Sequence, residues 1–179
     1  EVDGQVGRHA CCDVVSRGLS VWQGKVYTVA LDGKLSALSL KTGKPVWQTR
    51  TITDPSFNYT VTGAPQIAGK VVVVGSSGAD FGARGYVAGY DLETGKETWR
   101  SFVVPRNPAL GAQESPELDA ALKSWSPDTD WRHGGGGTVW DGMAYDADHN
   151  LLYVGTGNGS GYNSRTRSPG GGDNRHLAS

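Results

Sequence analysis

Runs of apolar, β-branched residues broken by polar turns follow the same order in two stretches of the chain. Residues 24–47 and residues 69–99 both begin with Gly-Lys-Val, pass through a turn into a second strand-like stretch, and then reach Thr-Gly-Lys and a tryptophan. β-branched and aromatic residues favour strands, and glycine supplies the positive φ that tight turns require. Each stretch therefore predicts several short strands. The second copy also carries an insertion at residues 76–85.

The tryptophans that end the two copies give the spacing of the repeat. Trp47 and Trp99 lie 52 positions apart (99 − 47), and such a period is typical of propellers and similar arrays. We expect both indoles to pack between neighbouring sheets and to hold the repeats together. Asp32-Gly33 predicts a hairpin turn inside the first copy.

A third, degenerate copy begins within residues 142–159. Its predicted strands are residues 142–146 and 151–156. Between them, the sequence Asp-Ala-Asp-His-Asn is expected to replace the Thr-Gly-Lys turn of the other copies.

One segment departs from the β pattern. Residues 115–125 predict a short helix in the connection between the second and third copies. Ser115 is the expected N-cap and Pro116 the expected first helical residue, positions that suit these residue types.

The predicted fold class is all-β, in the form of a partial β-propeller. A propeller closes with roughly four to eight four-stranded blades, and the chain supplies about two to three. The predicted units are residues 1–58, residues 59–105 and an incomplete third unit at residues 106–179. Alone they would leave strand edges open, so we expect the chain to be a fragment of a larger propeller.

Charge and composition exclude several classes of function. The formal net charge is −1 and no Lys/Arg cluster is present, so we expect no nucleic acid partner. No run of 18 or more apolar residues occurs, so no transmembrane segment is expected. The chain has neither the Gly-Lys-Ser/Thr of a phosphate loop nor the His-Glu-x-x-His of a zinc protease.

The only two cysteines, Cys11 and Cys12, are adjacent. They lack the Cys-x-x-Cys spacing of zinc or redox sites, and His9 nearby does not complete a metal site. Spacing alone leaves open whether they act together or are two unrelated thiols.

Polar or aromatic residues stand among glycines where predicted strands end. Asp80 follows an apolar strand inside the insertion, Trp140 follows four glycines, and Asn158 lies on the glycine-rich segment 155–161. Glycine at strand ends lets backbone approach a ligand closely, and carboxylate and amide oxygens are ligands that calcium takes. Each residue alone is also compatible with an ordinary turn.

Six motifs together resemble one family. They are Ala-Cys-Cys-Asp-Val-Val-Ser-Arg-Gly, Thr-Gly-Ala-Pro, the segment 75–91, Gly-Gly-Gly-Thr-Val-Trp-Asp-Gly-Met-Ala-Tyr-Asp, Gly-Thr-Gly-Asn and Arg-Ser-Pro-Gly-Gly-Gly-Asp-Asn, in this order. The chain resembles the N-terminal third of the pyrroloquinoline quinone (PQQ)-dependent alcohol dehydrogenases of the methanol dehydrogenase and quinohaemoprotein type. The resemblance covers nearly the whole chain and implies an eight-bladed propeller as the parent.

The resemblance implies that Cys11 and Cys12 form a disulfide within one dipeptide, lying against one face of the quinone. Neighbouring Cα atoms are closer than disulfides ordinarily require, so such a ring is strained. A disulfide needs an oxidising compartment, which implies a periplasmic location.

The resemblance also assigns the remaining cofactor contacts residue by residue. Arg17 matches the arginine that binds PQQ oxygens, since a planar guanidinium suits carboxylate and carbonyl groups. Trp140 matches the indole that forms the floor of the pocket. The other residues that match cofactor contacts are Thr62, Ser77, Gly78, Ala79 and Thr138.

For the metal, the resemblance points to Asp80 and Asn158. Asn158 matches a calcium ligand. Asp80 departs from the family, which typically has glutamate there. Aspartate is one methylene shorter, so the ion must shift, a water must intervene, or the carboxylate must bind through one oxygen. The resemblance leaves open whether the cation is Ca²⁺ or a lanthanide ion.

The implied reaction is the oxidation of a primary alcohol to an aldehyde by metal-assisted hydride transfer to PQQ. Electrons would then pass to a cytochrome c, and haem c is expected only if the parent has a C-terminal haem domain. The family's general base, an aspartate, is expected after Ser179, so no catalytic residue is predicted in this chain and the fragment alone should be inactive. Two alternatives remain open: a non-enzymatic propeller scaffold of the outer-membrane assembly type, and a PQQ dehydrogenase for polyols or sugars.

Overall fold

The computed structural model describes residues 5–10, 15–54 and 56–174. Within them lie two four-stranded antiparallel sheets, each formed by strands in chain order. The first sheet contains β1 (Ser20–Trp22), β2 (Lys25–Val29), β3 (Lys34–Ser39) and β4 (Pro45–Arg50). The second contains β5 (Gln66–Ala68), β6 (Val71–Gly75), β7 (Tyr86–Asp91) and β8 (Glu97–Phe102).

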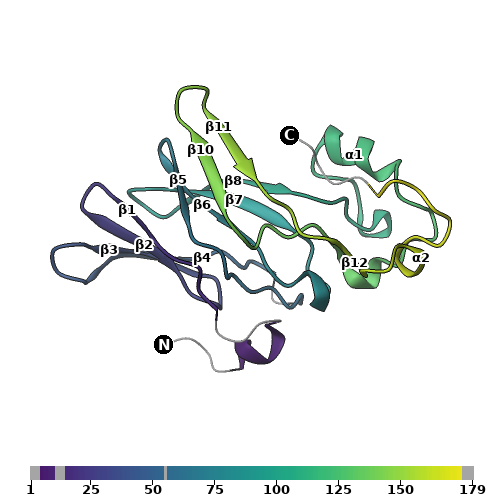
Figure 1. Ribbon diagram of the computed structural model, residues 1–179, viewed down its shortest axis with the longest axis horizontal. Coiled ribbons are helices and arrows are strands. Elements are labelled where there is room, and N and C mark those ends of the chain that lie inside the picture. Colours follow the sequence, from purple (N-terminus) through teal and green to yellow (C-terminus); the bar gives the residue numbers. More distant parts are fainter. Residues whose placement is uncertain (1–4, 11–14, 55, 175–179) are drawn as a thin grey trace.

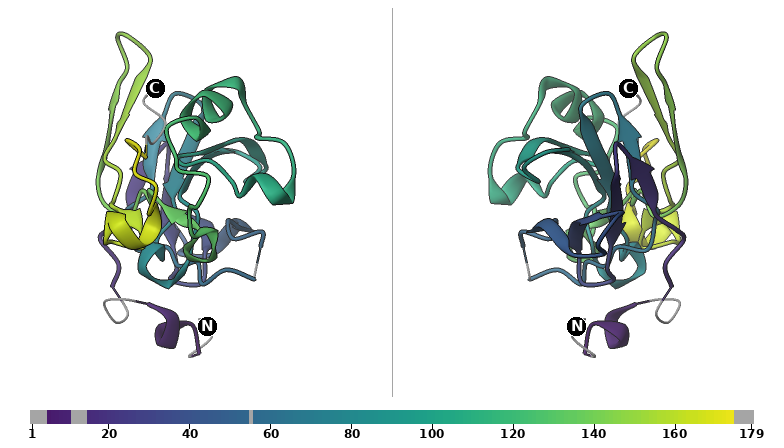
Figure 2. Two further views of the ribbon diagram at one scale, coloured as in Figure 1. Left: turned by 90° about the vertical axis from the view of Figure 1, so that its right-hand side faces the viewer. Right: turned by 90° about the vertical axis from the view of Figure 1, so that its left-hand side faces the viewer.

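A third unit is smaller. The hairpin β10 (Met143–Asp146) and β11 (Leu151–Val154) lies beside the second sheet, on the side away from the first (Figure 1). A separate short pair is formed by β9 (Gly135–Gly136) and β12 (Gly159–Ser160). In Figure 2 the β10–β11 hairpin projects well beyond the rest of the molecule.

The helices are short and lie in the connections. They are η1 (Val6–His9), η2 (Ala79–Phe81), η3 (Pro108–Leu110), α1 (Pro116–Leu122), η4 (Trp131–His133) and α2 (Ser164–Arg167). The helix expected at residues 115–125 is confirmed as α1, where the Ser115 side chain accepts a hydrogen bond from the backbone N–H of Leu118. Among the described helices, none has the length and apolar character needed to cross a membrane.

The two sheets repeat each other in detail. Glycines with positive φ make the third turn in both, Gly43 (φ 69°) and Gly95 (φ 70°). A register shift also occurs at the same place in each sheet, between Ala37 and Leu38 and between Gly89 and Tyr90. The repeat seen in the sequence is therefore a repeat of backbone geometry.

The third unit requires a correction. The turn after Asp146 was expected to replace the Thr-Gly-Lys turn, which joins the third and fourth strands of a sheet. Instead it joins β10 and β11, and β10 lies beside β5 as β5 lies beside β1. β10 and β11 are therefore the first and second strands of the third unit. The turn between them corresponds to Gly69-Lys70, which joins β5 and β6. The expectation was wrong because strand pairs of similar length look alike until their neighbours in space are known.

Apolar side chains of β6 face two different cores because successive residues of a strand point to opposite faces. Val72 and Val74 pack against the first sheet with Tyr27 and Leu35. Val73 packs on the other face against the residues of the third unit and its connection, including Val104, Trp125, Val139, Met143 and Leu152. The second sheet is thus the middle layer.

Trp47 packs between the first and second sheets as expected. Its Nε1 donates a hydrogen bond to the Leu92 carbonyl (3.0 Å), and a Cβ added to Gly95 would come within 2.4 Å of its ring. Trp99 is 39% exposed and lies against Gly89 of its own sheet. The expectation for Trp99 therefore stays a prediction.

Candidate cofactor and metal site

One cavity of ≈ 230 Å³ collects residues from five separate parts of the chain. All nine predicted cofactor and metal residues that the structure describes line it, and the tenth lining residue is Phe81. The lining residues are Arg17, Thr62, Ser77, Gly78, Ala79, Asp80, Phe81, Thr138, Trp140 and Asn158. Cys11 and Cys12 lie outside the described residues.

The segment that follows β6 brings Ser77 and Asp80 to the cavity. Gly78 has φ 107°, and a Cβ added there would lie 2.3 Å from the Asn58 carbonyl oxygen, so only glycine fits this turn. The chain then forms η2, and the Ala83 N–H closes the turn by donating to the Gly78 carbonyl (3.1 Å). The insertion noticed in the sequence is a compact turn with a carboxylate exposed on it.

Thr62 connects three of the segments that line the cavity. Its Oγ1 lies 2.9 Å from Ser77 Oγ and donates to the Trp140 carbonyl oxygen (3.2 Å). Its own carbonyl accepts a hydrogen bond from the backbone N–H of Arg17 (3.0 Å). Because Thr62 and Ser77 are each only 5% exposed, these bonds are protected from water and hold the cavity wall in one arrangement.

A charged group lies over an aromatic plane at the mouth of the cavity. The guanidinium carbon of Arg17 is 4.8 Å from the centroid of the Trp140 ring, within cation–π range. Trp140 is 39% exposed. The nearest carboxylate partner that the structure shows for Arg17 is the exposed Asp141, with Nε–Oδ1 at 3.9 Å. Screening by water makes such a pair weak, so within the described residues no close carboxylate compensates the Arg17 charge.

The glycine run before Thr138 allows two backbone segments to touch. A Cβ on Gly136 would lie 2.5 Å from the Asn158 carbonyl oxygen. The Gly137 N–H donates to that same carbonyl (3.0 Å), and the Gly157 N–H donates to the Thr138 carbonyl (2.8 Å). The segments carrying Thr138 and Asn158 are therefore held side by side.

The two predicted metal ligands supply hard oxygen atoms to the same cavity. Both Asp80 and Asn158 are exposed. Asn158 donates through Nδ2 to the Gly159 carbonyl (3.0 Å), which does not use its side-chain oxygen. In the described part of the chain, no cluster of three or more His, Cys, Asp or Glu side chains could hold a metal ion. Since Ca²⁺ takes six to eight oxygens, these two residues fit such a cation in kind and supply only part of its coordination.

Sequence reasoning missed Ser160, which is 3% exposed. Its Oγ donates to the Ala79 carbonyl (2.6 Å) across 81 positions of sequence. It also missed Asp141 beside Arg17. Both lie within motifs already noticed in the sequence, but nothing in a motif shows which distant atom a side chain reaches.

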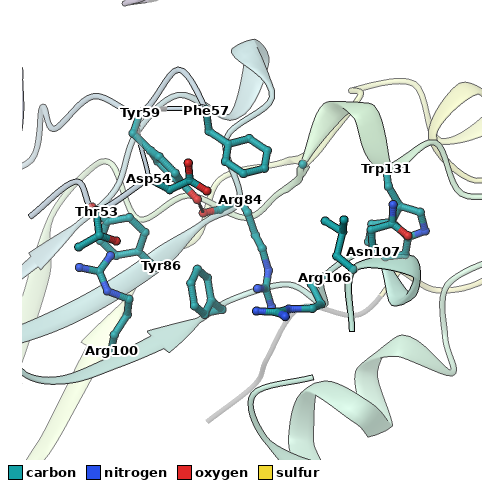
Figure 3. A pocket seen from close by; sticks show the side chains of 13 residues that line it. Thr53, Asp54, Phe57, Tyr59, Arg84, Tyr86, Arg100, Arg106, Asn107 and Trp131 are labelled. Carbon is teal, nitrogen blue, oxygen red and sulfur yellow. Dashed lines mark hydrogen bonds between the residues drawn. The ribbon is translucent and has the colours of Figure 1, made fainter. Parts of the chain in front are cut away.

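A second cavity of ≈ 220 Å³ was also not predicted (Figure 3). It is lined by aromatic side chains and by three arginines, Arg84, Arg100 and Arg106. The guanidinium carbons of Arg84 and Arg100 each lie 4.0 Å from a ring centroid, those of Phe102 and Tyr86 respectively.

Each arginine of the second cavity already has a carboxylate partner. Arg84 binds both oxygens of Glu114 (2.7 and 2.9 Å), Arg106 shares Glu114 (2.5 Å), and Arg100 binds Glu97 (2.6 Å). Burial by itself raises the pKa of Glu114, but hydrogen bonds and charge from Arg84, together with Arg106, outweigh it and hold that pKa at about 2. The arginines of this cavity are therefore already paired within the protein, as expected of a structural network.

Comparison with known proteins places these features in a family. A family model described as PQQ, glucose/ethanol/alcohol dehydrogenase, beta-propeller domain, matches residues 3–176. The quinohemoprotein alcohol dehydrogenase ADH IIB of Pseudomonas putida is 54% identical over 172 residues, which cover 96% of this chain and 25% of that protein. The chain thus spans about a quarter of the length of the curated relatives it matches.

Solved structures agree with the partial propeller. The quinohemoprotein alcohol dehydrogenase from Comamonas testosteroni matches with a TM-score of 0.94 and 46% identity, over 99% of this chain and 27% of that one. A europium-containing methanol dehydrogenase matches with a TM-score of 0.81 and 35% identity, over 98% of this chain and 31% of that one.

Proposed function

Because this chain belongs to the PQQ-dependent glucose/ethanol/alcohol dehydrogenase family of β-propeller domains, we propose that it is part of a quinoprotein alcohol dehydrogenase. The whole enzyme would oxidise a primary alcohol to an aldehyde and pass the electrons to a cytochrome c. This chain would contribute one wall of the cofactor site.

The observation that carries the proposal is the convergence of nine predicted residues on one cavity. PQQ is a flat, multiply charged carboxylate, so it needs an aromatic plane and donors at its edge. Trp140 offers the plane. Arg17 supplies a positive charge whose carboxylate partner among the described residues is the exposed Asp141, and the Thr62–Ser77 pair supplies hydroxyl groups at the same cavity. An aromatic plane, a positive charge and hydroxyl groups at one cavity support the proposal that these residues hold PQQ.

Asp80 and Asn158 would hold the cation, with further ligands from the cofactor and from the rest of the protein. Their oxygens suit Ca²⁺. A lanthanide is the alternative, since one matching solved structure is described as europium-containing. The shorter reach of aspartate favours binding through one oxygen or through a water.

When bound, PQQ would supply a two-electron acceptor and the cation would supply Lewis acidity. The residues of this chain bind and orient. Trp140 would fix the plane of the ring system, Arg17 would orient its acidic edge, and the buried Thr62 would keep these two segments in register. A general base is expected after Ser179, so the chain by itself would bind without turnover.

The cysteine pair and the compartment belong to the same proposal. Cys11 and Cys12 would form a disulfide against the cofactor, and a stable disulfide calls for an oxidising compartment. The periplasm fits this requirement. Haem c would be present if the whole protein carries a haem domain. The name quinohemoprotein, which the Pseudomonas putida and Comamonas testosteroni relatives described above carry, supports this expectation.

The test uses the full-length parent, prepared without cofactor. PQQ is added with Ca²⁺ or with a lanthanide ion, and dye-linked ethanol oxidation is followed before and after mild reduction of the disulfide. We expect activity that needs PQQ and one of the two metals and falls on reduction. Glucose or glycerol in place of ethanol tests the sugar and polyol alternative. Absence of PQQ binding with either metal would contradict the proposal and favour a non-enzymatic scaffold.

A further inference from the structure

We infer that Ser160 is a positioning residue for the metal site, because its hydroxyl ties the helical turn that carries Asp80 to the strand that follows Asn158. This inference rests on the proposed function, since it concerns the two residues assigned to the cation. It adds a residue that does not line the cavity itself.

The Ser160 hydrogen bond is short, buried and long-range in sequence. Oγ donates to the Ala79 carbonyl at 2.6 Å, and the side chain is 3% exposed. Ala79 is the first residue of η2 and directly precedes Asp80. The same carbonyl also accepts from the Gly82 N–H (3.1 Å). Asn58 Nδ2 also ties the turn to the preceding segment by donating to the Phe81 carbonyl (3.1 Å), and the Ser160 hydroxyl ties it to β12.

The backbone around Ser160 fixes Asn158 relative to it. Ser160 pairs with Gly135 and Gly159 pairs with Gly136 in the β12–β9 ladder. The Gly137 N–H donates to the Asn158 carbonyl (3.0 Å). A shift of Ser160 would thus be a shift of Asn158 as well. The Gly85 N–H also donates to the Gly136 carbonyl (2.8 Å), so the Ser160 hydroxyl acts together with this backbone bond to set the separation of the two predicted metal ligands.

Arg167 supports the same strand from its other side. Its Nη1 donates to the Gly161 carbonyl (2.6 Å), and its guanidinium lies so close to Gly159 that an added Cβ there would be 2.8 Å from Cζ. The guanidinium is itself held by the buried Asn174, whose Oδ1 accepts from Nε (3.1 Å). Arg167 and Asn174 are the first and last residues of the Arg-Ser-Pro-Gly-Gly-Gly-Asp-Asn motif. We infer that this motif supports the strand that follows Asn158.

The physical consequence concerns two ligands on separate segments. A Ca²⁺–oxygen distance varies only between about 2.3 and 2.6 Å, so both oxygens must be in place together. Without the hydroxyl, η2 keeps its internal bonds and its bond to Asn58 but loses its side-chain hydrogen bond to β12, so it is held less firmly against the Asn158 segment. Loss of residues that orient metal ligands typically weakens metal binding by about 10- to 100-fold.

The experiment measures metal affinity in the full-length parent, not turnover. Ca²⁺ titration calorimetry in the presence of PQQ compares wild type with Ser160→Ala, and amide hydrogen exchange of residues 78–82 is followed without metal. We expect about tenfold weaker Ca²⁺ binding and faster exchange in Ser160→Ala. Ser160→Thr, which keeps the hydroxyl, should retain most of the affinity.

Thr51→Val is the matched control. Thr51 is fully buried and its hydroxyl also donates to a backbone carbonyl, that of Gly33 (3.0 Å), far from the cavity. We expect it to lower stability and leave Ca²⁺ affinity unchanged. If Ser160→Ala does not fold, Arg167→Lys tests the same strand from its other side and should weaken Ca²⁺ binding in the same direction.

The outcomes separate the two ideas. Wild type that binds PQQ and Ca²⁺, with Ser160→Ala and Arg167→Lys binding Ca²⁺ equally well, overturns the role of Ser160 and leaves the proposed function intact. Wild type that binds neither PQQ nor a metal overturns the proposed function, and this inference with it.

Discussion

The two cavities contain the same kinds of side chain and differ in how their charges are partnered. In the second cavity, Arg84 is 8% exposed and makes a two-pronged contact with Glu114. In the candidate site, Arg17 lies over Trp140, and the carboxylate beside it is exposed and 3.9 Å away. Arginine over an aromatic ring is common to both places.

This difference shows why residue types alone do not define a binding site. A guanidinium held by a carboxylate has already exchanged its water for a protein partner, so it contributes to the fold. A guanidinium with only a screened partner still has that interaction to offer to an anionic ligand. Substitutions in the two cavities should therefore affect different measurable quantities.

The largest effect is expected from Arg84→Met in the full-length parent. It leaves Glu114 partly buried with Arg106 as its remaining partner, and we expect a loss of about 3 kcal/mol in the free energy of unfolding, at the lower end for a broken buried pair. Denaturant unfolding measures the loss, and PQQ titration should show unchanged affinity. A change in PQQ affinity without a change in stability would reverse the assignment of the two cavities.

Next in size is Trp140→Ala. We expect PQQ affinity to fall by about 2 kcal/mol, roughly 30-fold, as for loss of an aromatic stacking surface, with little change in stability because the indole is 39% exposed. The control is Trp131→Ala in the second cavity, whose ring stacks on Trp125 with centroids 5.2 Å apart. Trp131→Ala should lose stability and keep PQQ affinity. If Trp140→Ala binds PQQ as tightly as Trp131→Ala does, Trp140 does not form part of the PQQ site.

Arg17→Lys should have a smaller effect. Lysine keeps the charge and loses the planar fork that matches a carboxylate, so we expect PQQ to bind about tenfold more weakly, about 1.4 kcal/mol. Arg106→Lys makes the same change in the second cavity, and PQQ fluorescence titration should show no change there. If both variants bind PQQ like wild type, Arg17 is not a cofactor contact.

The pH dependence of stability tests the Glu114 ion pair in a second way. The pKa of Glu114 is lowered to about 2, because Arg84 and Arg106 outweigh the opposing effect of burial. A lowered folded-state pKa contributes stability at pH values above the ordinary pKa of 4.5, and this contribution is lost as the pH falls towards about 2. Thermal unfolding of Glu114→Gln should be less sensitive to acid than that of wild type over this range. Equal acid sensitivity would mean that the ion pair does not form in solution.

Local features of the fold were predictable from residues close together in sequence. The Asp32-Gly33 turn, the α1 helix with Ser115 as its cap, and the packing of Trp47 are all present. Each depends on backbone preferences within a few residues, or on a repeat that the sequence shows directly. The third unit was misaligned because two successive strands look alike without their neighbours.

The site was recognisable as a string of motifs, and the tertiary structure decided which of their residues meet. Arg17, Ser77 and Asn158 are far apart in sequence, yet they line one cavity. The cysteine pair lies outside the described residues, so its role stays a prediction.

The sequence by itself determined the repeated strands, their turns and the string of motifs that indicates the family, because these follow from local backbone preference and from motif order. Only the tertiary structure decided that, among the described residues, Arg17 has an exposed carboxylate 3.9 Å away while Arg84 is paired with Glu114 at 2.7 Å, and that Ser160 reaches Ala79 across 81 positions. Partner choice depends on distance and on exclusion of water. Both arise only when the sheets pack together.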